Sequence, residues 1–201
     1  LLLAQTLTLS LVVRRQFIFP AMKYLFYYLK GMKKLFHFIF MMVMGVSFAQ
    51  PKSYKTIMDM AYYDNPVDGT YQKERCKLDL YYPTDGENFP TVVWFHGGGL
   101  KGGSKSIPEP LKEKGLAVVA VNYRLHPKVN APKYIEDAAA AVAWVFDNID
   151  QYGGDSSQIY VCGFSSGGYL SLMVTLDQKW LKKHSIGANQ IKGVVTLSAT
   201  T

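Results

Sequence analysis

Short apolar runs recur along the chain from residue 78 onward. Residues 78–82 alternate between apolar and polar side chains and end at Pro83, which is typical of a half-buried strand. Residues 91–95, 116–121, 159–162 and 191–197 are more continuously apolar. Such runs are expected of strands that are buried on both faces, so the pattern predicts a strand at each of these positions.

Helical spacing fills the intervals between these runs. Apolar residues repeat at this spacing over residues 134–149, in an alanine-rich context, and a second helix is predicted for residues 166–176. A weaker helical pattern covers residues 107–114. Strands that alternate with helices in this way predict an α/β fold with a mostly parallel central sheet and helices on both faces.

The region before these elements contains a targeting segment. A basic start at residues 32–34 is followed by an apolar run over residues 35–46 and by small residues at 47 and 49, a pattern typical of a secretory signal peptide over residues 32–49. The apolar run is short for a permanent bilayer span. We therefore expect an exported mature protein without a stable membrane span; an uncleaved signal anchor is the alternative.

The segments on either side of the signal peptide have different characters. Residues 1–31 are apolar, contain no acidic residue and begin on Leu1. We interpret them as sequence upstream of a start at Met32 or Met22, with an additional membrane segment as the alternative. Residues 50–77 predict a lead-in of loop and edge strand, and residues 78–201 predict the N-terminal part of the α/β domain.

The formal net charge of +7 comes almost entirely from the N-terminal segment. Residues 1–49 carry six basic residues and no acidic one, whereas the rest of the chain has 16 basic and 15 acidic residues. The charge is therefore no indication of nucleic-acid binding, and no nucleic-acid partner is expected.

The two cysteines, Cys76 and Cys162, have no metal-ligand spacing. Cys162 lies in an apolar run, and we interpret it as a buried thiol. A disulfide between the two would suit an exported protein, but it would place one end in a central strand, so we expect none. No metal or other cofactor is expected.

Residues 163–167 match the pattern G-x-S-x-G, with Ser165 at its centre. Small residues two positions before and after the serine allow a sharp turn between the predicted strand and helix, which leaves the hydroxyl projecting above the sheet. The N-terminus of the helix also favours negative charge there. Alone the pattern is weak, because an ordinary glycine–serine turn would also produce it.

A second glycine-rich motif comes directly after the strand predicted for residues 91–95. His96 is followed there by Gly97, Gly98 and Gly99, which would let a loop bring N–H groups to a reacting carbonyl. A phosphate-cradling loop is the alternative, but the Lys-Ser/Thr ending of a P-loop and the G-x-G-x-x-G spacing are both missing. The two motifs together predict a nucleophilic serine with an oxyanion hole.

Four stretches of the chain, residues 78–83, 96–99, 121–125 and 152–155, carry a likeness to a known superfamily. Together with the alanine-rich residues 137–144, they resemble the α/β-hydrolases. The similarity is to esterases of the hormone-sensitive lipase-like group and of the bacterial feruloyl and acetyl-xylan esterase-like (BD-FAE-like) group. Two positions depart from the pattern, because Ser166 stands where Ala is usual and Leu100 where an aromatic residue is common.

The resemblance implies an α/β-hydrolase fold, incomplete at the C-terminus, and a role for each site residue. Ser165 would attack an acyl carbonyl and form an acyl-enzyme. The oxyanion would be held by N–H groups of Gly98, Gly99 and Ser166, with Gly97 as a further candidate. Structural support would come from His96 orienting the glycine loop, from a polar brace of Tyr123, Arg124 and Asp137, and from Asp155 capping a turn.

The acid and base of a triad should follow Ser165 in the order Asp or Glu, then His. Asp177 and His184 have this order, but they fall at the end of the helix after the serine, and His126 precedes the serine. We therefore expect the triad Asp and His beyond Thr201. Residues 1–201 alone are expected to be nearly inactive and, with 194–197 as an unprotected apolar edge, prone to aggregation.

These features favour an exported serine hydrolase that cleaves small or carbohydrate-linked carboxylic esters. A serine peptidase or amidase on the same fold is an alternative. A non-catalytic binding protein with this fold is another, although such proteins usually lose the nucleophile. The sequence identifies neither the ester nor an oligomeric state.

Overall fold

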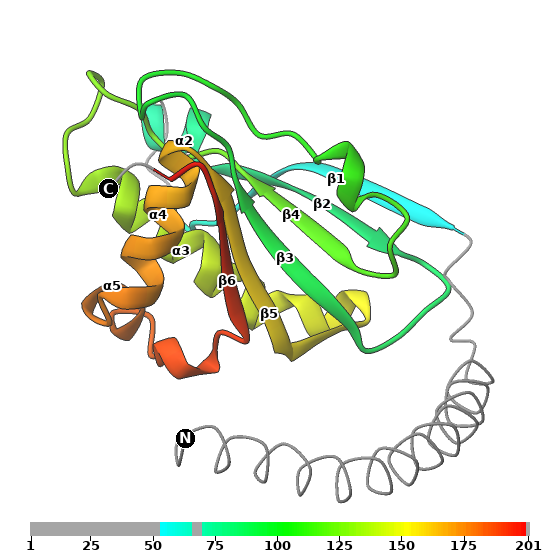
Figure 1. The fold of residues 1–201 in the computed structure, drawn as a ribbon. Coiled ribbons are helices and arrows are strands. Elements are labelled where there is room, and N and C mark those ends of the chain that lie inside the picture. The colour runs from blue at the N-terminus through cyan, green and yellow to red at the C-terminus, as the bar shows by residue number, and fades with distance from the viewer. Residues whose placement is uncertain (1–52, 66–69, 200–201) are drawn as a thin grey trace, which may run out of the picture. The chain divides into compact units, whose positions relative to one another are not determined.

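The computed structural model describes residues 53–65 and 70–199, so the predicted signal peptide and the segment before it lie outside the described residues. Six strands form one sheet in the order β1-β2-β4-β3-β5-β6 (Figure 1). The pairs β1–β2 and β2–β4 are antiparallel, and β4, β3, β5 and β6 run parallel to one another, which confirms the mostly parallel sheet. The strands are β1 (Tyr54–Ala61), β2 (Lys77–Pro83), β3 (Phe89–Phe95), β4 (Ala117–Val121), β5 (Gly154–Phe164) and β6 (Gly193–Leu197).

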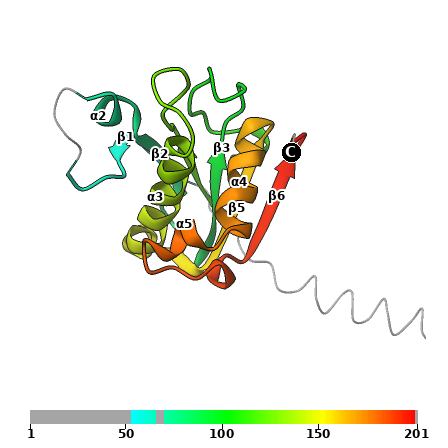
Figure 2. The same ribbon diagram turned by 90° about the vertical axis from the view of Figure 1, so that its left-hand side faces the viewer.

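Two long helices, α3 and α4, pack side by side against one face of the sheet, as Figure 2 shows. Both were predicted from the sequence within one residue of their ends. The short α5 packs against α3 on the same side. The bounds are α2 (Tyr71–Arg75), α3 (Lys133–Asn148), α4 (Ser166–Leu176) and α5 (Lys179–Lys182), with 3-10 turns η1 (Glu109–Leu111), η2 (Ile149–Tyr152) and η3 (Ala188–Gln190).

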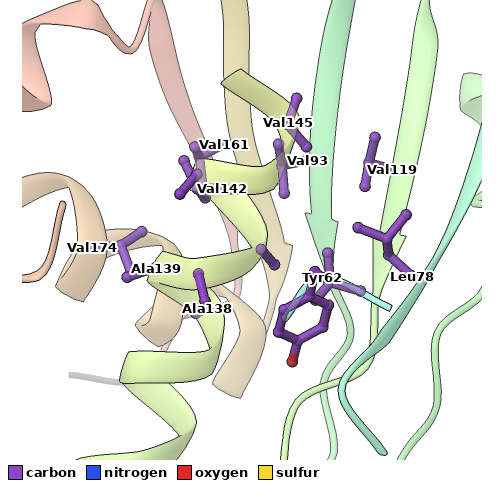
Figure 3. Packing of buried hydrophobic residues seen from close by; sticks show 14 of the residues in the cluster. Tyr62, Leu78, Val93, Val119, Ala138, Ala139, Val142, Val145, Val161 and Val174 are labelled. Carbon is purple, nitrogen blue, oxygen red and sulfur yellow. The ribbon is translucent and has the colours of Figure 1, made fainter. Parts of the chain in front are cut away.

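The main core lies between α3, α4 and the central strands. Alanines form most of the buried face of α3, and their small side chains allow the helix to approach the sheet closely. Figure 3 shows Val142 and Val145 of α3 meeting Val93 and Val161 of the strands in one apolar cluster. This packing holds the carboxyl ends of β3 and β5, which lead directly into the His96 and Ser165 motifs.

The second face of the sheet is covered by the connection between β3 and β4. Asp79 and Tyr81 alternate with core residues along β2 and therefore face this side. Lys105 Nζ lies 2.6 Å from Asp79 Oδ1, and the Glu113 N–H donates to the Tyr81 hydroxyl at 3.2 Å. We expected helices on both faces, but in the described part of the chain α3, α4 and α5 share one face.

The helix predicted for residues 107–114 was wrong. Only the turn η1 forms there. Pro108 and Pro110 flank its first residue, and a proline has no N–H to donate to a helix. The prolines therefore stop helical hydrogen bonding before a second turn can form.

The lead-in contains the expected edge strand, β1, and a short helix, α2, that the sequence did not predict. Thr70 begins α2 by accepting a hydrogen bond from the Lys73 N–H at 3.4 Å. Five residues are too few to show a helical period. This helix places Arg75 beside the carboxyl ends of the parallel strands.

Candidate active site

Ser165 lies in the turn between β5 and α4 in a strained backbone conformation. Its φ of 52° and ψ of −118° are rarely adopted by a residue with a side chain. Neighbours hold it there, because its N–H donates to the Leu197 carbonyl at 2.8 Å and its carbonyl accepts from the Tyr169 N–H at 3.1 Å. Its hydroxyl makes no hydrogen bond with a described residue, which leaves Oγ available to a substrate.

The glycines of the Ser165 turn allow chain segments to cross at very short range. A Cβ on Gly163 would lie 2.4 Å from the Gly167 carbonyl oxygen, and a Cβ on Gly167 would lie 2.1 Å from the Phe95 carbonyl oxygen. No side chain fits into either gap. The turn therefore packs directly on the end of β3, from which the glycine loop begins.

The glycine loop begins immediately beside Ser165. The position of a Cβ on Gly97 lies 3.3 Å from Ser165 Cβ. Gly98 and Gly99 have φ values of 122° and 62°, and the Gly98 carbonyl accepts from the N–H groups of Lys101 and Gly102 at 3.1 and 3.0 Å. The loop thus closes on itself through a carbonyl, next to the serine.

The N–H groups predicted for the oxyanion hole remain unused in the described structure. None of the hydrogen bonds within residues 53–65 and 70–199 takes its donor from the amide of Gly98, Gly99 or Ser166. Ser166 is also the first residue of α4, where amide N–H groups have no partner in the helix. The structure therefore brings a strained serine and free amides to one edge of the sheet.

Comparison with known proteins agrees with this arrangement. The family model described as BD-FAE matches residues 78–199, which is more than half of the chain. The chain belongs to the BD-FAE family. The predicted likeness to α/β-hydrolase esterases is thereby confirmed.

Curated relatives are esterases that match part of the chain. A probable isoprenylcysteine alpha-carbonyl methylesterase, ICMEL1, from Oryza sativa subsp. japonica is 36% identical over 112 residues, covering 53% of this chain and 26% of the relative. Carboxylesterase NlhH from Mycobacterium tuberculosis is 38% identical over 97 residues, covering 46% of this chain and 30% of the relative. The chain thus spans less than a third of the length of these relatives.

Solved structures show the same fold. Esterase B from Lactobacillus rhamnosis, inhibited by a tributyrin phosphonate, has a TM-score of 0.60 and 25% identity, covering 74% of this chain and 50% of that one. A truncated carbohydrate esterase from gut microbiota has a TM-score of 0.54 and 26% identity, covering 66% of this chain and 46% of that one. The fold of this BD-FAE chain is therefore the α/β-hydrolase fold, and the chain spans about half of these structures.

His96 is buried beneath the glycine loop of the BD-FAE chain, and its ring stacks on Tyr123 at 4.5 Å. Its Nε2 lies 3.2 Å from an Arg75 guanidinium nitrogen, and its Nδ1 lies 2.6 Å from the Gly97 carbonyl oxygen. Because a guanidinium can only donate, we assign Nε2 as the acceptor and Nδ1 as the protonated nitrogen. Burial lowers the pKa of His96, the hydrogen bond to Gly97 opposes this, and the Arg75 charge lowers it further. The assigned hydrogen bonds are those of a neutral ring, with Nε2 engaged by Arg75 and Nδ1 by the Gly97 carbonyl.

The expected brace of Tyr123, Arg124 and Asp137 separates into two groups. The Tyr123 hydroxyl donates to the His96 carbonyl at 2.7 Å and so belongs to the glycine loop. Asp137 is fully buried and accepts from the Arg124 side chain, at 2.6 Å at the closest, and from the Tyr63 hydroxyl at 2.8 Å. Its hydrogen bonds to Arg124 raise the pKa of that guanidinium above its ordinary value.

Asp155 lies at the far end of β5 from Ser165. Its carboxylate accepts from the N–H and hydroxyl of Ser157 and from the Gln158 side chain, at 2.6 to 2.8 Å. These hydrogen bonds lower the pKa of Asp155 below its ordinary range. The residue holds the turn that begins the strand and has no contact with the site.

The other histidines that the structure describes do not reach Ser165. The His126 ring is exposed and lies 3.2 Å from the Asn130 side-chain oxygen. His184 lines a cavity with Ser156 and Ser157, at the start of β5. Asp177 follows the last residue of α4, roughly 18 Å along the helix from Ser165, and pairs with Lys179. The described residues therefore supply no base at the serine.

Other features bear on cofactors and membranes. Within residues 53–65 and 70–199, no three His, Cys, Asp or Glu side chains group closely enough to hold a metal ion. Cys76 and Cys162 are both buried free thiols. Of the helices that the structure describes, none combines the length and apolar character that a membrane crossing needs.

Arg75 is the residue at this site that sequence reasoning missed. It lies at the end of α2 and donates to His96, Gly103 and Tyr123, all close to the glycine loop. It lies outside both motifs, in a segment predicted as loop and edge strand. Local sequence patterns carried no signal for it, because its partners follow it by 21 to 48 positions.

Proposed function

We propose that this BD-FAE protein is a serine esterase that works through an acyl-enzyme on Ser165. The observation that carries the proposal is the position of this strained serine beside Gly97, with the amides of Gly98, Gly99 and Ser166 free. Strain at a residue with no structural need for it is typical of a functional site. The family membership and the esterase names of the relatives support the same chemistry.

The reaction uses the free amides to stabilise charge. Ser165 Oγ attacks the acyl carbonyl carbon, and its proton passes to a base while the carbonyl oxygen becomes an oxyanion. The N–H groups of Gly98, Gly99 and Ser166 donate to that oxyanion, and each such donor contributes about 3–4 kcal/mol to the transition state. Collapse expels the alcohol, which takes up a proton, and water then releases the acid from Ser165.

The N-terminus of α4 contributes to the same stabilisation. Ser166 is its first residue, so the unpaired amides of the helix point towards the developing charge. The Ser166 hydroxyl is buried without a hydrogen-bond partner among the described residues. The group proposed to act on the oxyanion is the backbone N–H of Ser166, which an alanine there would preserve.

The substrate proposed is a small or carbohydrate-linked carboxylic ester. The proteins that this chain resembles include a carboxylesterase and a carbohydrate esterase. An ester is favoured over an amide because all the relatives and structures compared above are esterases by name.

Export is a separate proposal, carried by the signal-peptide pattern of residues 32–49. Expression in a bacterial host followed by cell fractionation and N-terminal sequencing tests it. A mature N-terminus at Gln50 in the exported fraction is expected. Retention of the whole segment in the cytoplasmic fraction would contradict it.

A fluorophosphonate probe tests the catalytic proposal. The full-length protein should become labelled on Ser165 and should hydrolyse p-nitrophenyl acetate, and Ser165→Ala should lose both properties. Ser166→Ala is the matched control, because it removes a neighbouring hydroxyl but keeps the amide donor, so labelling should persist. Faster hydrolysis of an anilide than of the ester would point to an amidase, and absence of labelling on Ser165 would point to a binding protein.

A further inference from the structure

The guanidinium of Arg75 connects three separate parts of the chain around the glycine loop. One terminal nitrogen lies 2.6 Å from the Gly103 carbonyl oxygen and 3.2 Å from His96 Nε2. The Nε atom donates to the Tyr123 carbonyl, just beyond β4, at 3.1 Å. A weaker contact of 3.4 Å joins the other terminal nitrogen to the Ser104 hydroxyl. The side chain thus ties the end of α2 to both ends of the glycine loop.

His96 and Gly103 are the first and last residues of the glycine loop, which here means residues 96–103. Gly103 has a φ of 93°, and a Cβ there would lie 2.4 Å from the Gly97 carbonyl oxygen and 2.5 Å from His96 Nδ1. The backbone at Gly103 is therefore in direct contact with the start of the loop. A shift of the Gly103 carbonyl would displace Gly97, which lies against Ser165.

The loop is held through its carbonyl oxygens, while the amides of Gly98 and Gly99 stay free. Arg75 binds the Gly103 carbonyl, His96 Nδ1 binds the Gly97 carbonyl, and the Gly98 carbonyl accepts from two amides of its own turn. The amides of Gly98 and Gly99 take no part in this. An anchor made only of donors can fix the loop without consuming the N–H groups that an oxyanion needs.

An arginine is suited to this position because its planar fork presents several donors in fixed directions. A lysine ammonium keeps the charge but has no fixed fork with which to hold Gly103, His96 and Tyr123 at once. Among the described residues, Arg75 forms no ion pair with a carboxylate, and its hydrogen bonds go to neutral acceptors. Its role is thus not that of a surface salt bridge.

We propose that Arg75 is a positioning residue, which sets the place of the Gly98 and Gly99 amides by holding His96 and Gly103. This inference rests on the proposed esterase function. Arg75 touches neither substrate nor nucleophile in it. Its loss lowers turnover because the oxyanion donors are displaced, and it leaves substrate binding largely unchanged.

The test compares Arg75→Met and Arg75→Lys with Tyr62→Phe in the full-length protein. Tyr62 is the matched control, because its hydroxyl donates to the Asn122 carbonyl at 2.8 Å, next to the strand end that Arg75 holds, but makes no hydrogen bond to the loop. The measurements are the melting temperature, kcat and KM for a p-nitrophenyl ester, and nitrogen NMR of His96.

Arg75→Met should lower kcat by about tenfold or more and change KM by less than about threefold, since a displaced oxyanion donor acts on the transition state. Arg75→Lys should fall between this variant and the wild type. Tyr62→Phe should keep kcat within about twofold of the wild type, even if its melting temperature falls as far as that of Arg75→Met. A loss of stability that leaves the protein folded does not displace the oxyanion donors. In the NMR spectrum, the wild-type His96 should carry its proton on Nδ1, and Arg75→Met should show a partly protonated Nε2.

Wild-type kcat in a folded Arg75→Met protein would overturn the proposal. Equal losses of kcat in Arg75→Met and Tyr62→Phe at equal stability would also overturn it. If Arg75→Met does not fold, Arg75→Lys decides by the same criteria. A wild-type protein that neither hydrolyses esters nor labels on Ser165 would refute the proposed function instead, and the His96 spectrum would still test the link to Arg75.

Discussion

Gly97 offers a sharp test of the geometry at Ser165. An alanine there would place its Cβ 2.9 Å from Phe164 Cδ1, 3.1 Å from the Phe164 carbonyl oxygen and 3.3 Å from Ser165 Cβ. The Phe164 ring is half exposed and can rotate away. The carbonyl and Ser165 Cβ belong to the strained turn and cannot move as freely, so the loop itself must retreat.

The size of the effect follows from these distances. Carbon atoms pack best at about 3.5–4.0 Å, so the loop must move by a few tenths of an ångström, up to about half an ångström. A misplacement of about 1 Å can cost about 100-fold in rate, so about half of that distance should cost about tenfold. Gly97→Ala should therefore lower kcat about tenfold with a small change in KM, as expected for an interaction made in the transition state.

Gly102→Ala is the matched control within the same loop. A Cβ on Gly102 has its nearest neighbour, the Gly98 carbonyl oxygen, at 4.0 Å, so it fits without displacement. Steady-state hydrolysis of a p-nitrophenyl ester by both variants measures the difference, and thermal unfolding shows whether both remain folded. Equal kcat values for Gly97→Ala and the wild type would refute the claim that the loop and the serine are in contact.

Three further predictions concern stability, reactivity and association. Asp137→Ala should destabilise the protein by about 3–5 kcal/mol in chemical denaturation, because it leaves the largely buried Arg124 charge without its partner. An Arg124→Met, Asp137→Leu double variant should lose less than the sum of its single variants, and simple additivity would contradict the pairing. Burial and the neighbouring Asp137 raise the pKa of the Cys76 thiol to about 12, so almost no thiolate exists at pH 8. Ellman's reagent should therefore modify Cys76 in urea but hardly in the native protein. Val195 and Leu197 of β6 are 51% and 49% exposed, and an exposed apolar edge strand promotes association between molecules. Val195→Lys should therefore lower the light scattering of purified residues 1–201. Unchanged scattering would show that association uses another surface.

Local sequence was sufficient for elements whose signals lie within a few residues. Helix α4 begins and ends where its pattern predicted, because the glycine–serine turn precedes it and an apolar run continues it. The strands at residues 91–95 and 159–162 were placed correctly, although β5 extends further in both directions. The error at residues 107–114 was also local, since Pro108 and Pro110 are visible in the sequence and weigh against a helix.

The triad Asp and His differ from these elements, because they stay a prediction from sequence order. Sequence order placed them after Ser165, and none of the described residues occupies that place at the serine. The roles of Tyr123 and Arg124 were also not separable by sequence, because adjacent residues just beyond a strand can turn to different neighbours. Only their hydrogen bonds to His96 and Asp137 show which belongs to the glycine loop.

The sequence by itself determined that Ser165 follows a strand and begins a helix, and that a flexible glycine loop follows another strand. Tertiary structure decided that the two meet, because β3 and β5 pair in parallel with Phe95 opposite Gly163, which brings both strand ends to one edge of the sheet. It also decided that Arg75 reaches this edge, through a helix of five residues with no detectable period. The physical reason is the same in both cases: pairing between strands and hydrogen bonds from a guanidinium join residues far apart in the chain, whereas sequence patterns report only on neighbours.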